Sequence, residues 1–94
     1  MNETKEEIYT KAFLKWGFMP QMGMVVEECA ELIQATNKFM RKNDNKSREH
    51  FYEELVDVEI MIEQMRIIFN KDKAQIDKIK EKKLERLEKM LEVE

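Results

Sequence analysis

The sequence predicts an all-α fold, with four helices forming a single domain over residues 1–94. The chain contains only two glycines and one proline, whereas an all-β fold needs many turn residues. Apolar residues recur every three or four positions over long stretches, which is the period of a helix that packs by one face. The length suits one domain, and so small a domain buries little of its surface, which favours association with a second copy.

The first two helices are expected at about residues 3–16 and 20–41. The intervening sequence GFMP interrupts the helical pattern because glycine relaxes the backbone, and Pro20 suits the first turn of a new helix. Apolar positions of the second helix recur at alternating steps of four and three residues, which is the spacing of a packing seam. The residues of this predicted seam are Val25, Cys29, Leu32, Thr36 and Phe39.

The third and fourth helices are expected at about residues 47–69 and 72–92. The polar sequence KNDNKS precedes the third helix, and either Asp44 or Ser47 is expected to cap it. This helix is apolar on more than one side, so it needs several packing neighbours, a partner chain among them. The fourth helix carries a narrow apolar stripe within dense lysine and glutamate, as expected of an exposed helix. The predicted seam of the third helix consists of Phe51, Leu55, Val58, Ile62, Met65 and Phe69.

The composition argues against several classes of protein. The formal net charge is −3, whereas proteins that bind nucleic acids through bulk electrostatics are normally basic. The single cysteine, Cys29, allows neither an intrachain disulfide nor a zinc cluster of cysteine and histidine ligands. No apolar run approaches the ~18 residues of a membrane span or resembles a signal peptide. We therefore expect a cytoplasmic protein with no membrane or nucleic-acid partner.

The stretch MVVEECAELIQ places three carboxylates, those of Glu27, Glu28 and Glu31, within an otherwise apolar run. Residues three apart on a helix lie on the same side, so Glu28 and Glu31 point the same way. Acidic pairs at this spacing also arise by chance in a chain with 20 acidic residues. These glutamates differ from such pairs because no basic residue lies within three positions of any of them.

Glu54 and Asp57 form a second acidic pair of the same spacing, again among apolar residues. If the second and third helices form an antiparallel hairpin, the two acidic pairs face each other. Four charges beside a core are costly, so the carboxylates must be protonated, turn to water or bind a cation. Hard oxygen ligands without a nearby imidazole or thiolate pair favour Mg²⁺, or Mn²⁺ in its place.

The two acidic segments carry a family resemblance. EECAE, residues 27–31, is followed after 22 residues by ELVD, residues 54–57. This pattern resembles the EExxE…ExxD signature of the MazG-like, all-α nucleoside triphosphate pyrophosphohydrolases. The resemblance extends from about Trp16 to Glu88, across two long helices and a following lysine-rich helix. It implies a MazG-like bundle that is completed by oligomerisation, as a homodimer or homotetramer.

The resemblance also implies a reaction and the residues that perform it. Water would attack the α-phosphorus of a nucleoside triphosphate, giving a monophosphate and pyrophosphate. The implied Mg²⁺ ligands are Glu28, Glu31, Glu54 and Asp57. Glu31 also receives a catalytic role, and Glu27 is expected to orient a water molecule or to act as the base.

Candidate substrate contacts follow from the position of basic and aromatic residues. Lys38 lies two turns after the first acidic motif on nearly the same helix face, so it could reach the phosphates. Lys83 and Arg86 could reach them from a neighbouring helix or subunit. Trp16 could form a stacking wall for the base, together with Phe13. Surface lysines and core aromatics are the common alternatives for these residues.

Other functions stay open at this point. Within the same superfamily, the motifs also fit a phosphoribosyl-ATP pyrophosphatase or a dUTP- or dCTP-type pyrophosphatase. A non-catalytic helical oligomerisation protein is the alternative from a different class. A di-iron site is disfavoured, because bundle di-iron sites use a histidine on each of two helices and this chain has only His50.

Overall fold

The computed structural model describes residues 2–92, and this part of the chain is helical with no strand. The all-α prediction is confirmed, and each predicted helix is present with ends that differ by no more than two residues. Within the described range, no helix combines the length and the apolar character needed to cross a membrane. The elements are α1 Lys5–Trp16, α2 Phe18–Lys42, α3 Asn45–Ile68, the 3₁₀ turn η1 Asn70–Asp72 and α4 Lys73–Glu92.

The corner between α1 and α2 depends on a glycine. Gly17 adopts a φ of 83°, a left-handed conformation that glycine accepts without steric cost. Its backbone N–H donates to the carbonyl of Phe13 at 2.8 Å and so closes the end of α1. Pro20 then lies in the first turn of α2, where its missing N–H is not needed.

The turn between α2 and α3 reverses the chain within two residues. Asn43 takes a left-handed conformation with φ 50° and ends α2. The Asp44 carboxylate accepts the backbone N–H of Ser47 at 2.8 Å, and the Ser47 side chain faces the Asp44 backbone N–H in return. This reciprocal capping box starts α3, so Asp44 is the cap and Ser47 its partner.

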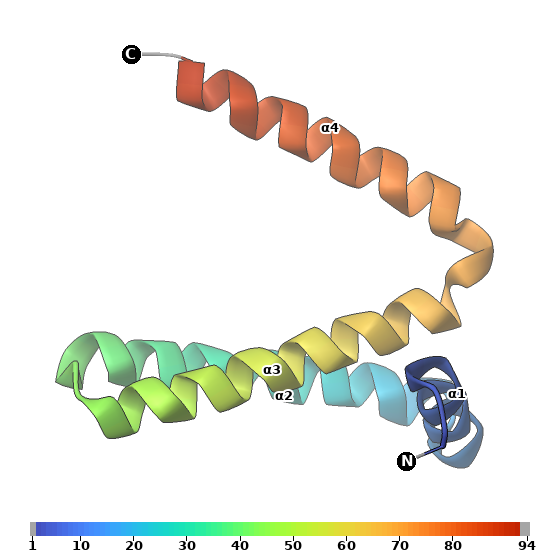
Figure 1. Ribbon diagram of the computed structural model, residues 1–94, viewed down its shortest axis with the longest axis horizontal. Helices are drawn as coiled ribbons and strands as arrows, with labels where there is room; N and C mark the ends of the chain where they lie inside the picture. Colours follow the sequence, from blue (N-terminus) through green and yellow to red (C-terminus); the bar gives the residue numbers. More distant parts are fainter. Residues whose placement is uncertain (1, 93–94) are drawn as a thin grey trace.

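The two long helices lie side by side and antiparallel, and α1 packs across the open end of this hairpin (Figure 1). The hydroxyl of Tyr9 on α1 donates to Glu63 on α3 at 2.7 Å. The amine of Lys5 lies 3.4 Å from the same carboxylate. These contacts hold α1 against α3, and α1 therefore covers the end of the α2–α3 face opposite the turn.

The fourth helix leads away from the hairpin after η1 (Figure 1). Its first turns are held to α3 by Asp77, which accepts from Arg66 at 2.8 Å and pairs with Lys73 at 2.7 Å. The apolar stripe of α4 is largely exposed, with Leu84 55% and Leu87 51% accessible. An amphipathic helix whose apolar face is open to solvent is incomplete without a packing partner.

The seam between α2 and α3 differs from the predicted one by a single residue at four positions, one of which is Ala35 in place of Thr36, which is itself half-buried. Cys29, Leu55 and Ile62 were expected in the seam, and all three are exposed. The structure instead buries or half-buries the residue before each one, and it keeps the alternating steps of four and three. The observed seam consists of Gln21, Val25, Glu28, Leu32, Ala35 and Phe39 on α2, and Ser47, Phe51, Glu54, Val58, Met61 and Met65 on α3.

Candidate functional site

A group of three carboxylates bridges the middle of the hairpin. Glu28 comes from α2, and Glu54 and Asp57 come from successive turns of α3. One oxygen of each lies within 4.8 Å of an oxygen of the other two. Glu54 is only 8% exposed, Glu28 is half-buried and Asp57 is open to solvent, so the group runs from the helix seam to the surface.

Two oxygens of this group have no hydrogen-bond partner within the described part of the chain. They are Oε2 of Glu28 and Oε2 of Glu54, and both are buried. Buried polar atoms in folded proteins are normally paired, because leaving one unpaired costs free energy. Among residues 2–92, no lysine or arginine forms a salt bridge with any of the three carboxylates. The donor set therefore fits a hard divalent cation such as Mg²⁺, which prefers carboxylate oxygens.

Burial and mutual repulsion disfavour the ionised forms of Glu28 and Glu54. Burial raises the pKa of Glu28 above its usual value, and the charges of Glu31, Asp57, Glu54 and Glu27 raise it further. An elevated pKa means that the ionised form is disfavoured at this position. A bound cation would relieve both the desolvation and the repulsion.

Glu54 experiences the same forces from the other helix. Burial raises its pKa first, and the negative charges of Glu31 and Asp57 add to the effect. His50 acts in the opposite direction and lowers the pKa of Glu54, because its Nε2 lies 4.0 Å from Oε1 of Glu54. His50 is half-exposed and adjoins the carboxylate group. Its i, i+4 spacing to Glu54 is the sequence signal that indicates this contact.

The two remaining glutamates of the first motif lie at the margin of the group. Glu31 is exposed and near enough for its charge to act on Glu28 and Glu54, but it is not one of the three whose oxygens cluster. Glu27 is exposed and has the weakest effect on the pKa of Glu28. Glu31 therefore lies near enough to contact a ligand bound at the cluster, whereas no contact within the described chain places Glu27 there.

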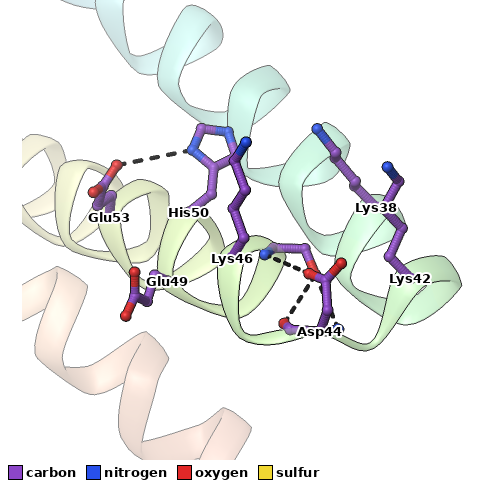
Figure 2. A pocket seen from close by; sticks show the side chains of 8 residues that line it. Lys38, Lys42, Asp44, Lys46, Glu49, His50 and Glu53 are labelled. Carbon is purple, nitrogen blue, oxygen red and sulfur yellow. Dashed lines mark hydrogen bonds and ion pairs between the residues drawn. The ribbon is translucent and has the colours of Figure 1, made fainter.

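A basic pocket of about 430 Å³ lies at the turn end of the hairpin. Lys38, Lys42, Lys46 and His50 contribute to its lining, and Figure 2 shows these four side chains extending to the same side. None of the three lysine amines forms a salt bridge within residues 2–92. Lys38 was predicted as a phosphate contact, whereas Lys42 and Lys46 were missed.

Two acidic residues that line this pocket, Asp44 and Glu53, have partners of their own. Hydrogen bonds from Ser47 hold the pKa of Asp44 below its usual value, and the charges of Lys42 and Lys38 lower it further. Glu53 lies 3.8 Å from Nδ1 of His50. In Figure 2, Glu53 reaches toward His50, whereas the carboxylate of Glu49, which also lines the pocket, lies away from the lysine amines. Three lysines and three carboxylates therefore line the pocket, and its positive side is the one to which the lysine amines extend.

A second pocket, of about 400 Å³, lies at the other end of the same face, where α1 crosses the hairpin. Its lining is mostly apolar and includes Trp16, the residue predicted to stack on a base. Met24 and Ile60 also line it, and each lies one helical turn from a carboxylate of the cluster. The pocket therefore adjoins the candidate metal site.

Lys83 and Arg86 are not brought near the carboxylates within this chain. They line a shallow hollow on α4 with Leu87 and Met90. Since α4 leads away from the hairpin, these cations would have to act on the site of another copy (Figure 1).

Comparisons of the chain with protein-family models, with curated proteins and with solved structures find no match. The class that the fold and the site define is an all-α protein with a carboxylate-rich candidate metal site between two antiparallel helices. The resemblance to MazG-like enzymes rests on the acidic motifs and their spacing.

Proposed function

We propose that this protein is a Mg²⁺-dependent pyrophosphohydrolase that cleaves a (d)NTP to the (d)NMP and pyrophosphate. The observation that carries the proposal is the meeting of Glu28, Glu54 and Asp57, with oxygens within 4.8 Å and two buried oxygens unpaired. An arrangement of this kind costs free energy unless the carboxylates are protonated, reach water or bind a cation. The EExxE…ExxD spacing of the same residues supports the reaction class.

The three clustered carboxylates would hold Mg²⁺, or Mn²⁺ in its place. When bound, the ion supplies neutralisation of phosphate charge and a more acidic water. Glu31, whose charge acts on the cluster, and Glu27, the first glutamate of the motif, would orient the attacking water and accept its proton. The oxygen of that water bonds to the α-phosphorus, the bond from this phosphorus to the bridging oxygen breaks, and pyrophosphate leaves.

The order of features along the hairpin supports a nucleotide as the substrate. An apolar pocket, three carboxylates and a basic pocket follow one another along the face shared by α2 and α3. Lys38 lies seven residues, or two turns, after Glu31 and so on nearly the same side of α2. A nucleotide has the same order of base, α-phosphate and terminal phosphates. The successive residues on α2 are Met24, Glu28 and Lys38, and those on the antiparallel α3 are Ile60, Asp57 and His50.

The terminal phosphates would lie in the basic pocket. Lys38, Lys42 and Lys46 would balance the charge of the leaving pyrophosphate, as phosphoryl transfer depends mainly on positioning and electrostatics. Their freedom from salt bridges within the described chain leaves the amines available to a phosphate.

A second copy of the chain would complete the fold as a homodimer or homotetramer. Only Ala35 and Met61 are both apolar and buried among the described residues. So small a core gives a 94-residue chain little stability of its own. The exposed apolar stripe of α4 would bury against the partner, and Lys83 and Arg86 would then reach a neighbouring site.

The test is pyrophosphate release from a panel of NTPs, dNTPs and phosphoribosyl-ATP, with Mg²⁺ and with chelator. The proposal expects metal-dependent release that Asp57→Asn lowers by about 100-fold and Glu85→Gln on α4 retains. The panel also separates the dUTP, dCTP and phosphoribosyl-ATP alternatives. No release from any compound, together with no thermal stabilisation by Mg²⁺, would contradict the proposal.

The exposed apolar face of α4 favours one other candidate, a non-catalytic helical oligomerisation protein. That function requires assembly but no metal. A cation that binds only the folded state must raise the melting temperature by mass action, so an unchanged melting temperature in Mg²⁺ would favour this candidate.

A further inference from the structure

We infer that the outer face of α2 is the surface on which a second copy of this chain packs, with the two α2 helices antiparallel. The inference rests on the assembly included in the proposed function and adds the surface that carries it. It does not depend on the metal chemistry. The face lies on α2 and is separate from the apolar stripe of α4.

A line of large apolar residues runs along α2 on the side away from α3. Its members follow one another at intervals of seven residues, and each is between 62% and 73% exposed. The last three each come five residues after a residue of the α2–α3 seam, which is about 140° around the helix. This face is therefore left uncovered by the described chain. The line consists of Met19, Val26, Ile33 and Met40.

The length and spacing of this line fit another helix as its cover. At a rise of about 1.5 Å per residue, the line extends over roughly 32 Å of α2. Extended apolar patches on soluble proteins mark interaction sites. A seven-residue repeat is the spacing that keeps two helices in contact along their length.

The residues between the large ones indicate that the covering helix is another α2. A small residue follows each of the first three large residues by four positions, and all of these small residues are exposed. In an antiparallel pair, large residues of one copy lie opposite small residues of the other, so the two faces interdigitate. In a parallel pair, small residues would meet small residues and leave gaps. The antiparallel pairs are Ile33 with Ala30, Met40 with Gly23, and Val26 with Asn37.

Gly23 adds an independent observation. It lies in the interior of α2, where glycine costs stability relative to alanine. Apart from the adjoining backbone of its own helix, no described atom lies within 4 Å of the place where a Cβ would stand. Nothing within one described copy therefore requires a glycine here. The close approach of a second helix does require a small residue.

The charges beside the line suit the same arrangement. One border of the line is uncharged, and the other carries Glu27, Gln34 and Arg41. Neither Glu27 nor Arg41 forms a salt bridge within residues 2–92. In the antiparallel pair, Glu27 of one copy lies between Gln34 and Arg41 of the other. No like charges meet at this border, so the face is complementary to itself.

Sedimentation equilibrium of the full chain tests the surface. Ile33→Glu should raise the dissociation constant of this contact by about 100-fold, because a charge from each copy would be buried. Ala30→Leu should raise it about tenfold, because the small position opposite Ile33 would be overfilled. Glutamate and leucine both favour helices and both positions are exposed, so the monomer fold is retained. Leu14→Glu, at an exposed residue of α1, is the matched control and should change nothing.

Spin labels on single-cysteine variants test the orientation. Cys29→Ser removes the one cysteine of the chain, and Met19→Cys or Gln34→Cys then introduces the label site. Because each residue adds about 1.5 Å, antiparallel pairing separates the two labels at position 19 by about 38 Å along the helix axis. The two labels at position 34 should lie close together. Parallel pairing would give short distances at both positions.

A monomeric wild type, an unchanged dissociation constant in Ile33→Glu or a short distance at position 19 would overturn the inference. Tighter association in Ala30→Leu would also do so, because it would show an unspecific apolar contact. A monomer that binds vesicles of phosphatidylcholine and phosphatidylserine would assign the face to a membrane surface instead.

Failure of the inference and failure of the proposed function are recognised separately. A protein that releases no pyrophosphate can still associate through α2. A protein whose association is disrupted by Leu87→Glu but not by Ile33→Glu would keep the proposed assembly and lose only the α2 surface.

Discussion

Glu28 of α2 and Glu54 of α3 face each other across the helix seam, at positions where apolar residues normally pack. One oxygen of each, with one of Asp57, lies in a group no more than 4.8 Å across. Neither glutamate has a lysine or arginine partner among residues 2–92, and each keeps one buried oxygen unpaired. At its centre the seam therefore contains carboxylates in place of apolar side chains.

Removing one charge from this pair should stabilise the metal-free protein. Burial and neighbouring charges raise the pKa of Glu54, so its ionised form opposes folding at neutral pH. Glu54→Gln should raise the melting temperature in chelator by a few degrees and eliminate the additional rise with Mg²⁺. Thermal denaturation with and without Mg²⁺ measures both effects. A lower melting temperature in chelator would mean that the carboxylate stabilises the fold.

Asp57→Asn should impair catalysis more than folding. Asp57 is the exposed member of the cluster, so its amide analogue disturbs little packing. Mutation of residues that only support a metal ligand typically lowers metal affinity or activity about 10–100-fold. Loss of an oxygen that binds the metal directly should therefore lower the rate of pyrophosphate release by about 100-fold. Rates at saturating Mg²⁺ are compared with those of Glu85→Gln. Equal rates in the two variants would remove Asp57 from the site.

The lysines of the turn should control substrate affinity. Lys42 and Lys46 line the basic pocket without salt bridges in the described chain. Replacing both by alanine should raise KM for a nucleoside triphosphate about tenfold, with a smaller change in kcat, as uniform binding is lost. The matched control replaces Lys80 and Lys82 of α4. An unchanged KM in the turn variant would place the terminal phosphates elsewhere.

The helix ends and the turn were predictable from the sequence, but the register of the seam was not. Breakers such as Gly17 and the Asp44–Ser47 box act locally, so their sequence signals are clear. Hydrophobicity selected Leu55 for the seam, although Glu54 fits the same spacing and is the residue buried. Burial of Glu54 depends on how α2 packs against α3, which no single segment encodes.

Sequence reasoning also missed most of the basic pocket. Lys38 was found from its position relative to the first acidic motif. Lys42 and Lys46 lie on opposite sides of the chain reversal, and only the turn geometry brings them to one pocket.

The contact between α1 and α3 should make stability depend on pH at both extremes. The hydrogen bond to Glu63, with burial and nearby negative charge, raises the pKa of Tyr9 to about 12. Its contribution is fully present below pH 10 and is lost as the pH rises toward 12. The same hydrogen bond, with Lys5, lowers the pKa of Glu63, so that contribution is lost as the pH falls through the folded-state value.

Tyr9→Phe should therefore lower the free energy of unfolding near pH 7 by about 0.5 kcal/mol, at the low end for a hydrogen bond that water can reach. It should also weaken the decline in stability above pH 10. Urea denaturation of both proteins across this range measures the difference. Parallel curves for wild type and variant would show that the bond does not titrate with folding.

The exposed stripe of α4 should be required for assembly. Leu87 is 51% exposed although it lies on the apolar face of its helix. Leu87→Glu should shift the protein toward the monomer in light scattering coupled to size exclusion, because a charge would be buried at the interface. Leu14→Glu on α1, at a residue 76% exposed, serves as the control. A monomeric wild type would contradict the assembly proposal.

The central claim is that a divalent cation binds between α2 and α3, and Mn²⁺ titration followed by electron paramagnetic resonance tests it most directly. The free ion gives a signal that bound ion loses, so the titration counts sites. The account predicts one saturable Mn²⁺ site per chain that Mg²⁺ competes for, that Glu54→Gln abolishes and that Glu85→Gln retains. No saturable binding, or binding that persists in Glu54→Gln, would contradict the account.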